Sequence, residues 1–269
     1  MGHSEDGEGA TRPTLGEQEA PLRAEDLAAL LRALPPQATL VGGQALAFWM
    51  ARYRLIPHGA AEDAGITSDA DLLGSAEDAR HLALHLQGRL VLAPKRALSS
   101  LVGQVRVPVL GAMLERNVDI LHKLYDSGGM RKSTDFTRRA IARATVVEFE
   151  PGWRLRVLHP LDVLASRVHN AVGLLRDKGP HVLTQLRWSI TVASHALLRA
   201  AQLPMPGQRA GRLAQEVLGL ATSSAGCQLH QKHGIEVFDA VPLRELSRIN
   251  PSFKTQAETM RKALLRSRA

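Results

Sequence analysis

The spacing of apolar and polar residues divides the chain into two parts with different predicted structure. Up to about residue 158, short apolar stretches of strand length alternate with segments of helical periodicity, whereas helical periodicity dominates afterwards. We therefore expect an α/β (α+β) unit over residues 23–158 and a helical unit over residues 159–269. Residues 1–22 hold five acidic residues and four glycines with little to bury, which predicts a disordered tail.

Individual elements follow from the same pattern and from the turn residues between them. The expected strands are residues 38–41, 68–73, 90–92, 100–109, 116–122, 145–150 and 154–158. The helices expected in the first unit are residues 24–34, 44–54, 75–87 and 135–142, with Ser75 as the N-cap of the third. The helices expected in the second unit are residues 161–175, 181–200, 207–221 and 251–268.

Composition excludes several classes of protein. Hydrophobic residues make up 45% of the chain and charged residues 22%, as in an ordinary globular protein. No apolar run approaches the roughly 18–20 residues that a membrane span needs. A single cysteine, Cys227, rules out an internal disulfide framework and a cysteine-rich metal site. The N-terminus lacks the basic and then apolar pattern of a signal peptide, so we expect a cytoplasmic protein without a membrane partner.

The net charge of +8 is distributed unevenly along the chain. Residues 1–150 contain 17 Lys/Arg and 19 Asp/Glu, a balance of −2, whereas residues 151–269 contain 17 and 7, a balance of +10. A near-neutral half with clustered carboxylates followed by a basic half suits a polyanionic ligand held between them. A solvated arginine-rich surface is the alternative interpretation.

A glycine pair stands where a predicted strand turns into a helix. Gly42 and Gly43 follow the strand at 38–41 and precede the helix at 44–54. Glycines allow the backbone to approach a phosphate closely, and the N-terminus of the next helix offers unpaired N–H groups. An ordinary tight turn is the alternative.

Two aspartates lie in the next predicted strand. Asp69 and Asp71 are two residues apart, so in a strand their side chains project from the same face. Neighbouring carboxylates repel each other unless a cation lies between them, and Mg²⁺ prefers oxygen ligands. The alternative is an exposed strand face with two solvated acids.

A third aspartate occurs in a later strand of apolar character. Asp119 lies between Val118 and Ile120, and a buried acid needs a partner. A neighbouring strand that brought Asp119 beside the first two aspartates would explain it. The alternative is an acid on an edge strand that pairs with Arg116 or Lys123.

Taken in order, the glycine turn, the Asp-x-Asp strand and the third aspartate resemble the nucleotidyltransferase fold of the DNA polymerase beta superfamily, a mixed sheet flanked by helices. The resemblance narrows to the abortive-infection class of bacterial nucleotidyltransferases, which includes toxins of toxin–antitoxin pairs. It covers about residues 38–176. The blocks that carry it are Val41-Gly-Gly-Gln-Ala-Leu, Thr67-Ser-Asp-Ala-Asp-Leu, Val118-Asp-Ile-Leu and Leu158-His-Pro-Leu-Asp-Val-Leu-Ala-Ser-Arg.

The resemblance implies transfer of a nucleoside monophosphate from a nucleoside triphosphate such as ATP to an acceptor hydroxyl, with release of pyrophosphate. It assigns two Mg²⁺ ions, or Mn²⁺, to three catalytic carboxylates, and the phosphates to the glycine turn with two further residues. The implied metal ligands are Asp69, Asp71 and Asp119, and the implied nucleotide contacts are Gly42, Gly43, Ser68 and Arg167. Relatives commonly have a lysine at the position of Arg167.

The acceptor and the partners are expectations from the same resemblance and from the basic second half. RNA, first of all a tRNA end, is the expected acceptor, with a protein hydroxyl or a small molecule as alternatives. A toxin-like or phage-defence protein with a cognate antitoxin is the expected role. The alternative is a catalytically degenerate member that retains the fold as an RNA- or protein-binding module.

Two other groups of metal-capable residues carry weaker interpretations. His81 and His85 lie four residues apart on one predicted helix, a spacing that can bind zinc, but no third ligand is near in the sequence. The set of Cys227, His230 and His233 matches no familiar metal site. We expect both groups to be ordinary structural or surface residues.

Overall fold

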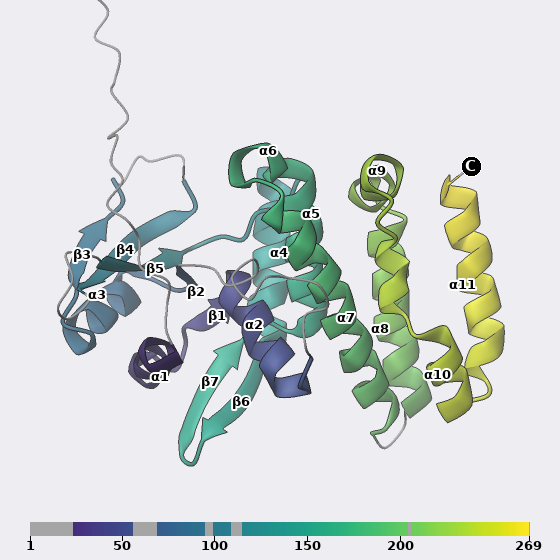
Figure 1. Cartoon of the computed structure of the whole chain (residues 1–269), viewed down its shortest axis with the longest axis horizontal. Coiled ribbons are helices and arrows are strands. Elements are labelled where there is room, and N and C mark those ends of the chain that lie inside the picture. The colour runs from purple at the N-terminus through teal and green to yellow at the C-terminus, as the bar shows by residue number, and fades with distance from the viewer. Residues whose placement is uncertain (1–23, 56–68, 95–98, 109–114, 204–205, 269) are drawn as a thin grey trace, which may run out of the picture.

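The computed structural model describes residues 24–55, 69–94, 99–108, 115–203 and 206–268. It shows a mixed α/β protein in which a seven-stranded sheet is followed by a region built only of helices. Figure 1 shows the sheet in one part of the molecule and helices α7 to α11 in the other, with the C-terminus at the far end. The predicted fold class is confirmed. The expected tail at 1–22 and Ser68 lie outside the described residues.

The sheet has the strand order β3-β4-β5-β2-β1-β7-β6. Its β1–β7 and β2–β5 pairs are parallel and the others antiparallel. Its strands are β1 (Thr39–Val41), β2 (Ala70–Leu73), β3 (Arg89–Leu92), β4 (Leu101–Pro108), β5 (Glu115–Leu121), β6 (Thr145–Glu150) and β7 (Trp153–Val157). Every predicted strand is present, although β2 begins at Ala70, so that Asp69 directly precedes it.

Four helices belong to the first part of the chain: α1 (Ala24–Ala33), α2 (Gly42–Tyr53), α3 (Ala76–His85) and α4 (Met130–Arg143). Ser75 caps α3 as predicted, because its hydroxyl accepts a hydrogen bond from the Asp78 backbone N–H and the Asp78 carboxylate accepts one from the Ser75 N–H. Such a capping box stabilises a helix by about 1 kcal/mol.

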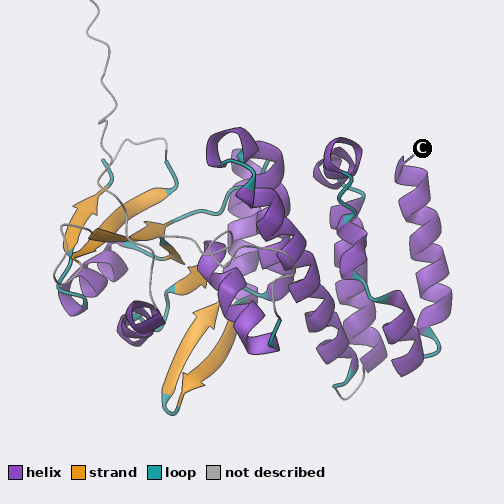
Figure 2. Ribbon diagram, viewed as in Figure 1, coloured by secondary structure: helices purple, strands orange, loops and turns teal. Residues whose placement is uncertain are grey.

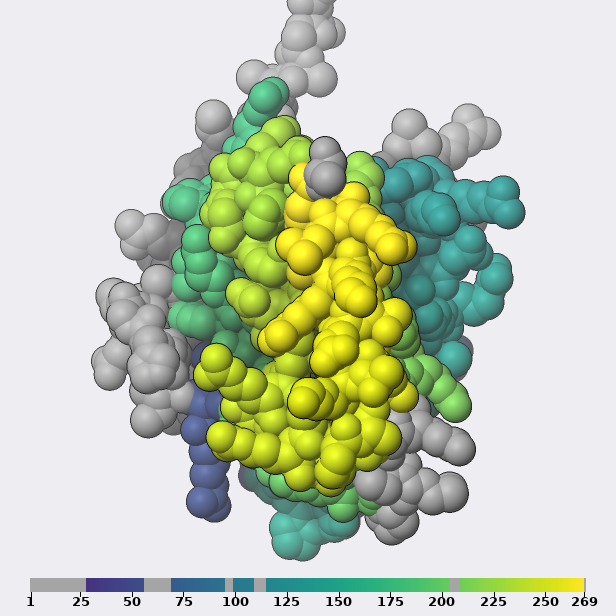
Figure 3. Space-filling model, turned by 90° about the vertical axis from the view of Figure 1, so that its right-hand side faces the viewer, coloured from purple at the N-terminus to yellow at the C-terminus, as the bar shows by residue number. Residues whose placement is uncertain are grey.

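The helical region contains α5 (Pro160–Gly173), α6 (Leu175–Lys178), α7 (His181–Ala201), α8 (Pro206–Ala221), α9 (Ser224–His233), a 3-10 turn (Val237–Ala240), α10 (Leu243–Ile249) and α11 (Phe253–Arg268). Figure 2 shows that strands are absent from the described residues of this region. In Figure 3, α11 lies on the outer surface of this end of the molecule. No described helix is long and apolar enough to cross a membrane.

Three predicted details are wrong. Helix α4 begins at Met130 instead of residue 135, because its polar first turn gave no apolar signal. Helix α2 begins at Gly42, so both glycines lie within its first turn. The short helices α6, α9 and α10 were not expected, since the segments around them are rich in histidine, glycine and proline.

The two regions are joined by packing. The indole N–H of Trp49 in α2 donates a 2.8 Å hydrogen bond to the Leu158 carbonyl, just before α5 begins. Val163 of α5 and Val192 of α7 belong to the same buried cluster as strands β1, β2 and β5. Helix α5 is therefore held both by the sheet and by the helical region, and its side chains can complete a site on the sheet.

Candidate functional site

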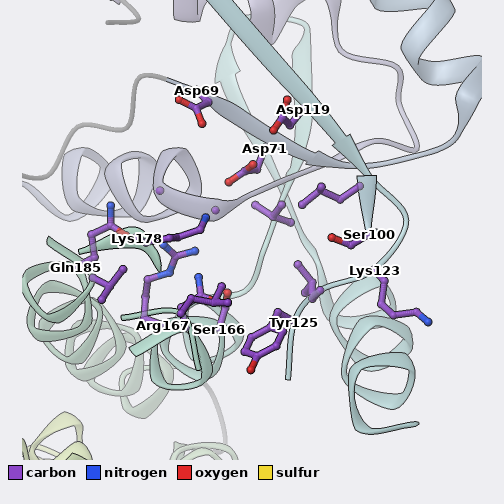
Figure 4. A pocket seen from close by; sticks show the side chains of 18 of the residues that line it. Asp69, Asp71, Ser100, Asp119, Lys123, Tyr125, Ser166, Arg167, Lys178 and Gln185 are labelled. Atoms are coloured by element: carbon purple, nitrogen blue, oxygen red, sulfur yellow. The ribbon is translucent and has the colours of Figure 1, made fainter. Parts of the chain in front are cut away.

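The register of the sheet places two of the predicted aspartates side by side. Asp71 in β2 and Asp119 in β5 are Cα partners in a parallel pair, and neighbouring strands lie about 4.8 Å apart. Asp69 lies two residues before Asp71, at the entrance to β2. Figure 4 shows all three carboxylates at one side of a cavity. The structure thus gathers residues that are 50 positions apart in the sequence.

Asp119 is not an edge-strand acid. Strand β5 lies between β4 and β2 within the sheet, and Arg116 lies on its opposite face by strand alternation. The Asp119 carboxylate accepts a 2.9 Å hydrogen bond from the side-chain amide of Gln104 in β4. Gln104 in turn accepts a 2.8 Å bond from Arg106 Nε, which fixes the orientation of its amide. The edge-strand interpretation is therefore wrong.

The first glycine of the predicted turn is required by Asp71. Gly42 has φ +66°, a left-handed conformation that favours glycine. A Cβ atom at this position would lie 2.0 Å from Asp71 Oδ2 and 2.8 Å from its Cβ. The glycine therefore makes room for a carboxylate. Gly42 and Gly43 also line the cavity, and no side chain of the described residues caps the start of α2.

The cavity has a volume of about 810 Å³ and lies between the sheet and the helices α5 to α7. The sheet side contributes the three aspartates and the start of α2. In Figure 4, Arg167 and Lys178 point from the helices toward Asp71, whereas Lys123 points away. The other polar lining residues are Ser100, Tyr125, Ser166, Asn170, His181 and Gln185. Acidic groups on one wall thus face basic groups on the other.

The charge of Asp71 is disfavoured by its surroundings. The pKa of Asp71 is raised from 3.8 to about 6, mainly by burial and to a lesser extent by the nearby carboxylates Asp119 and Asp69. The positive charges of Lys178 and Arg167 oppose this shift without cancelling it. A carboxylate in this state gains from a bound cation, and such perturbed groups are typical of functional sites.

Arg167 is buried without a complete set of partners. Its Nη1 donates a 2.6 Å hydrogen bond to the Gln185 side chain, while its buried Nε has no hydrogen-bond partner among the described atoms. Burial lowers the pKa of Arg167, and the negative charge of Asp71 acts in the opposite direction. An unsatisfied buried donor costs about 1–3 kcal/mol, so an anionic ligand that accepted from Arg167 would stabilise the site.

Lys178 and Gln185 were not identified from the sequence. Lys178 ends the four-residue helix α6, and Gln185 lies in the first half of α7. The basic stretch Arg176-Asp-Lys was a signal that could have pointed to Lys178. Nothing in the periodicity distinguishes Gln185 from other polar residues on a helix, because its importance comes from its contact with Arg167.

The carboxylates do not converge on a single point. Within the described part of the chain, no group of three or more histidine, cysteine, aspartate or glutamate side chains is arranged to hold a metal ion. The chemistry of the donors nevertheless fits Mg²⁺, since three carboxylates share one cavity wall and no cation of the described residues pairs directly with Asp71.

Comparisons with known proteins add little to this geometry. No family model matches the chain, and no curated protein matches it. Among solved structures, the crystal structure of JHP933 from Helicobacter pylori is similar at a TM-score of 0.34 and 13% sequence identity, covering 88% of this chain and 94% of that one. A TM-score of this size carries no argument about fold or function, so the chain is not assigned to a family.

Proposed function

We propose that the protein is a metal-dependent nucleotidyltransferase that resembles the abortive-infection class of the DNA polymerase beta superfamily. The observation that carries this proposal is the pairing of Asp71 with Asp119 on neighbouring parallel strands, against the glycine turn and opposite Arg167 and Lys178. Two carboxylates and a helix N-terminus in one polar cavity suit a triphosphate with its metal ions.

The chain's own residues divide the work of the reaction. Asp69, Asp71 and Asp119 hold the metal, which neutralises charge at the α-phosphate when it is bound. The backbone at Gly42 and Gly43 and the guanidinium of Arg167 bind the phosphates, and we add Lys178 to this group. The acceptor hydroxyl gives up its proton to the Asp119 carboxylate, and its oxygen forms a bond to the α-phosphorus. The bond between the α-phosphorus and the pyrophosphate oxygen breaks.

The acceptor that we favour is RNA, with a tRNA end as the first candidate and a protein hydroxyl or small molecule as alternatives. The outer helix α11 exposes Lys254, Arg261, Lys262 and Arg266 against one acid, Glu258, a balance that attracts a polyanion. A toxin-like or phage-defence role with a cognate antitoxin, in the cytoplasm, belongs to the same proposal.

A labelling assay tests the proposal. The protein is incubated with Mg²⁺, total RNA and each nucleoside triphosphate labelled at the α-phosphate, and the same is done with Asp69→Asn. A matched control is Asp135→Asn, which changes an exposed acid of α4 outside the cavity. Transfer should fall at least about 100-fold in Asp69→Asn, as for loss of a catalytic charge clamp, and remain in the control.

The second candidate is a non-catalytic binding module with the same fold. It is favoured by the observation that the described carboxylates are not arranged as a group that could hold a metal ion. Thermal unfolding with and without Mg²⁺ and a triphosphate separates the two. A higher midpoint of thermal unfolding with Mg²⁺ and triphosphate, but no label transfer to RNA or protein, supports the binding module. Label transfer that is equal in wild type and Asp69→Asn contradicts the proposed aspartate site and the nucleotidyltransferase proposal that rests on it.

A further inference from the structure

A second cavity of about 650 Å³ lies on another side of α5. Arg167 and Asn170 of this helix line the first cavity, whereas Ala165 and His169 line the second. The remaining walls come from the loop before α4 and from α4, α8 and α9. Its apolar lining comprises Phe136, Leu161, Leu164, Val217 and Leu220. None of the aspartates of the proposed nucleotidyltransferase site reaches it.

A serine and an aspartate contact the two ring nitrogens of His169 in this cavity. Ser127 Oγ lies 3.0 Å from Nδ1, and the Ser127 backbone N–H also donates to Nδ1 at 3.4 Å. Asp126 Oδ2 lies 3.3 Å from Nε2 on the other side of the ring. Because a backbone N–H can only donate, Nδ1 carries a lone pair and the ring proton resides on Nε2, facing the carboxylate.

Backbone hydrogen bonds hold Asp126 in place, and the side chains of Asp126 and His169 are largely shielded from water. Asp126 Oδ1 accepts a 2.7 Å hydrogen bond from the Gly128 N–H, and the Asp126 N–H donates to Ser133 Oγ at 3.0 Å. The Phe136 ring lies 5.9 Å from the imidazole. Burial lowers the pKa of His169, with Asp126 acting against this shift and Arg139 with it. A neutral imidazole therefore directs its lone pair at a serine hydroxyl, as a general base does.

We propose that this cavity is a second catalytic site, in which Ser127 is the nucleophile, His169 the general base and Asp126 a positioning residue, and that it cleaves carboxylic esters of small acyl groups. The apolar wall suits a short acyl chain, and the cavity volume admits a small ester. Helix α4 begins at Met130, three residues after the serine, and no described side chain caps it, so its first N–H groups favour negative charge there. This inference is independent of the nucleotidyltransferase proposal.

The reaction balances with water as the co-reactant. Ser127 Oγ forms a bond to the carbonyl carbon while its proton passes to His169 Nδ1. The bond between that carbon and the alcohol oxygen then breaks, and the departing alcohol takes the proton from Nδ1. Water repeats the two steps on the acyl-serine, which releases the carboxylic acid and restores the hydroxyl.

A fluorophosphonate probe and p-nitrophenyl butyrate test the assignment on the full chain. Wild type should be labelled at one serine, mapped to Ser127 by mass spectrometry, and should hydrolyse the ester. Both properties should be lost in Ser127→Ala, and hydrolysis should fall at least about 100-fold in His169→Gln. Ser224→Ala, which changes another serine of the same cavity, should behave as wild type. Asp126→Asn should lower kcat with little change in KM.

A second variant keeps the test decisive if Ser127→Ala fails to fold. Ser127→Cys retains a side chain that can contact His169, and iodoacetamide should alkylate the introduced thiol at least about tenfold faster than Cys227, because the base raises its thiolate fraction. If wild type is neither labelled nor active, and the introduced thiol reacts no faster than Cys227, Ser127 only ties the loop to α5 and the proposal is wrong. Asp69→Asn should leave all of these readouts unchanged.

Discussion

The molecule contains two contrasting arrangements of opposite charge, one at Asp162 and one at Asp71. Asp162 in α5 is completely buried and receives hydrogen bonds of 2.8 and 2.7 Å from Nε and Nη2 of Arg143, with Arg139 at 3.6 Å. Arg143 also pairs with Glu216. Burial alone would lower the pKa of Arg143, but its bonds to Asp162 and Glu216 outweigh this effect and raise it.

At Asp71 the opposite charges face each other across a cavity instead of pairing. Arg167 bonds to the neutral Gln185, and its Nε has no partner among the described atoms. The pKa of Asp71 is consequently raised to about 6, because burial, with a smaller contribution from Asp119 and Asp69, outweighs the charges of Lys178 and Arg167. Direct pairing satisfies charges within the fold, whereas separated charges retain the capacity to bind ions from solution.

The largest effect on stability should follow from breaking the paired cluster, which consists of Asp162, Arg143 and Glu216. Asp162→Ala leaves the half-buried Arg143 without its main partner and should lower the free energy of unfolding by about 3–5 kcal/mol. Adding Arg143→Met should recover part of this loss, since an apolar side chain needs no counterion. Urea titration of the single and double variants measures both effects. A loss below about 1 kcal/mol in the single variant would mean that the pair is not structural.

Neutralising the Asp71 carboxylate should raise the free energy of unfolding instead of lowering it. The pKa of Asp71 is 3.8 in the unfolded chain and about 6 in the folded protein. Between these pH values the folded state binds more protons than the unfolded state, so stability is lost as the pH rises through about 6. Asp71→Asn removes this cost and should raise stability at pH 7.5 by about 1–3 kcal/mol while abolishing nucleotide transfer. The gain should be absent at pH 4 and absent from Asp135→Asn.

His159, beside the paired cluster, should give a smaller pH dependence of stability in the reverse direction. His159 Nδ1 accepts a 3.2 Å hydrogen bond from the Leu161 N–H at the start of α5. Burial, together with the charges of Arg143 and Arg209, lowers the pKa of His159 from 6.5 to about 4. The folded state therefore binds fewer protons, and this stabilisation, present above pH 6.5, is lost as the pH falls toward 4.

His159→Asn keeps a cap acceptor without the titration. Wild type should lose about 1–2 kcal/mol more than this variant between pH 6.5 and 4, as measured by chemical unfolding at each pH. His85→Asn, at an exposed position, serves as the control. Parallel pH profiles for wild type and His159→Asn would show that His159 does not stay neutral in the fold.

The smallest effect should come from an ion pair at the surface. Arg32 donates to both carboxylate oxygens of Glu150, at 3.0 and 2.7 Å, but the two side chains are 48% and 35% exposed. Exposed pairs gain little because water already solvates both charges. Glu150→Gln should therefore leave the urea midpoint within experimental error. A clear loss would show that bidentate geometry matters more here than burial.

Local features were largely predictable from the sequence. The strand, glycine turn and helix around Gly42, the Ser75 cap and the strand that holds Asp71 all arise from short-range periodicity, turn chemistry and capping. Elements without an apolar stripe were missed, as the start of α4 and the short helices α9 and α10 show. In those segments tertiary contacts decide the conformation.

The sequence by itself determined the mixed α/β class and the helical second region, and it singled out Asp69, Asp71 and Asp119 as the candidate site residues. Only the tertiary structure decided that Asp71 pairs with Asp119, that Gly42 makes room for a carboxylate, and that Lys178 faces it. The same holds for the contacts of Ser127 with His169, which are 42 residues apart. Periodicity reports the face on which a side chain lies. Strand register and helix packing, which depend on the whole core, decide which faces meet.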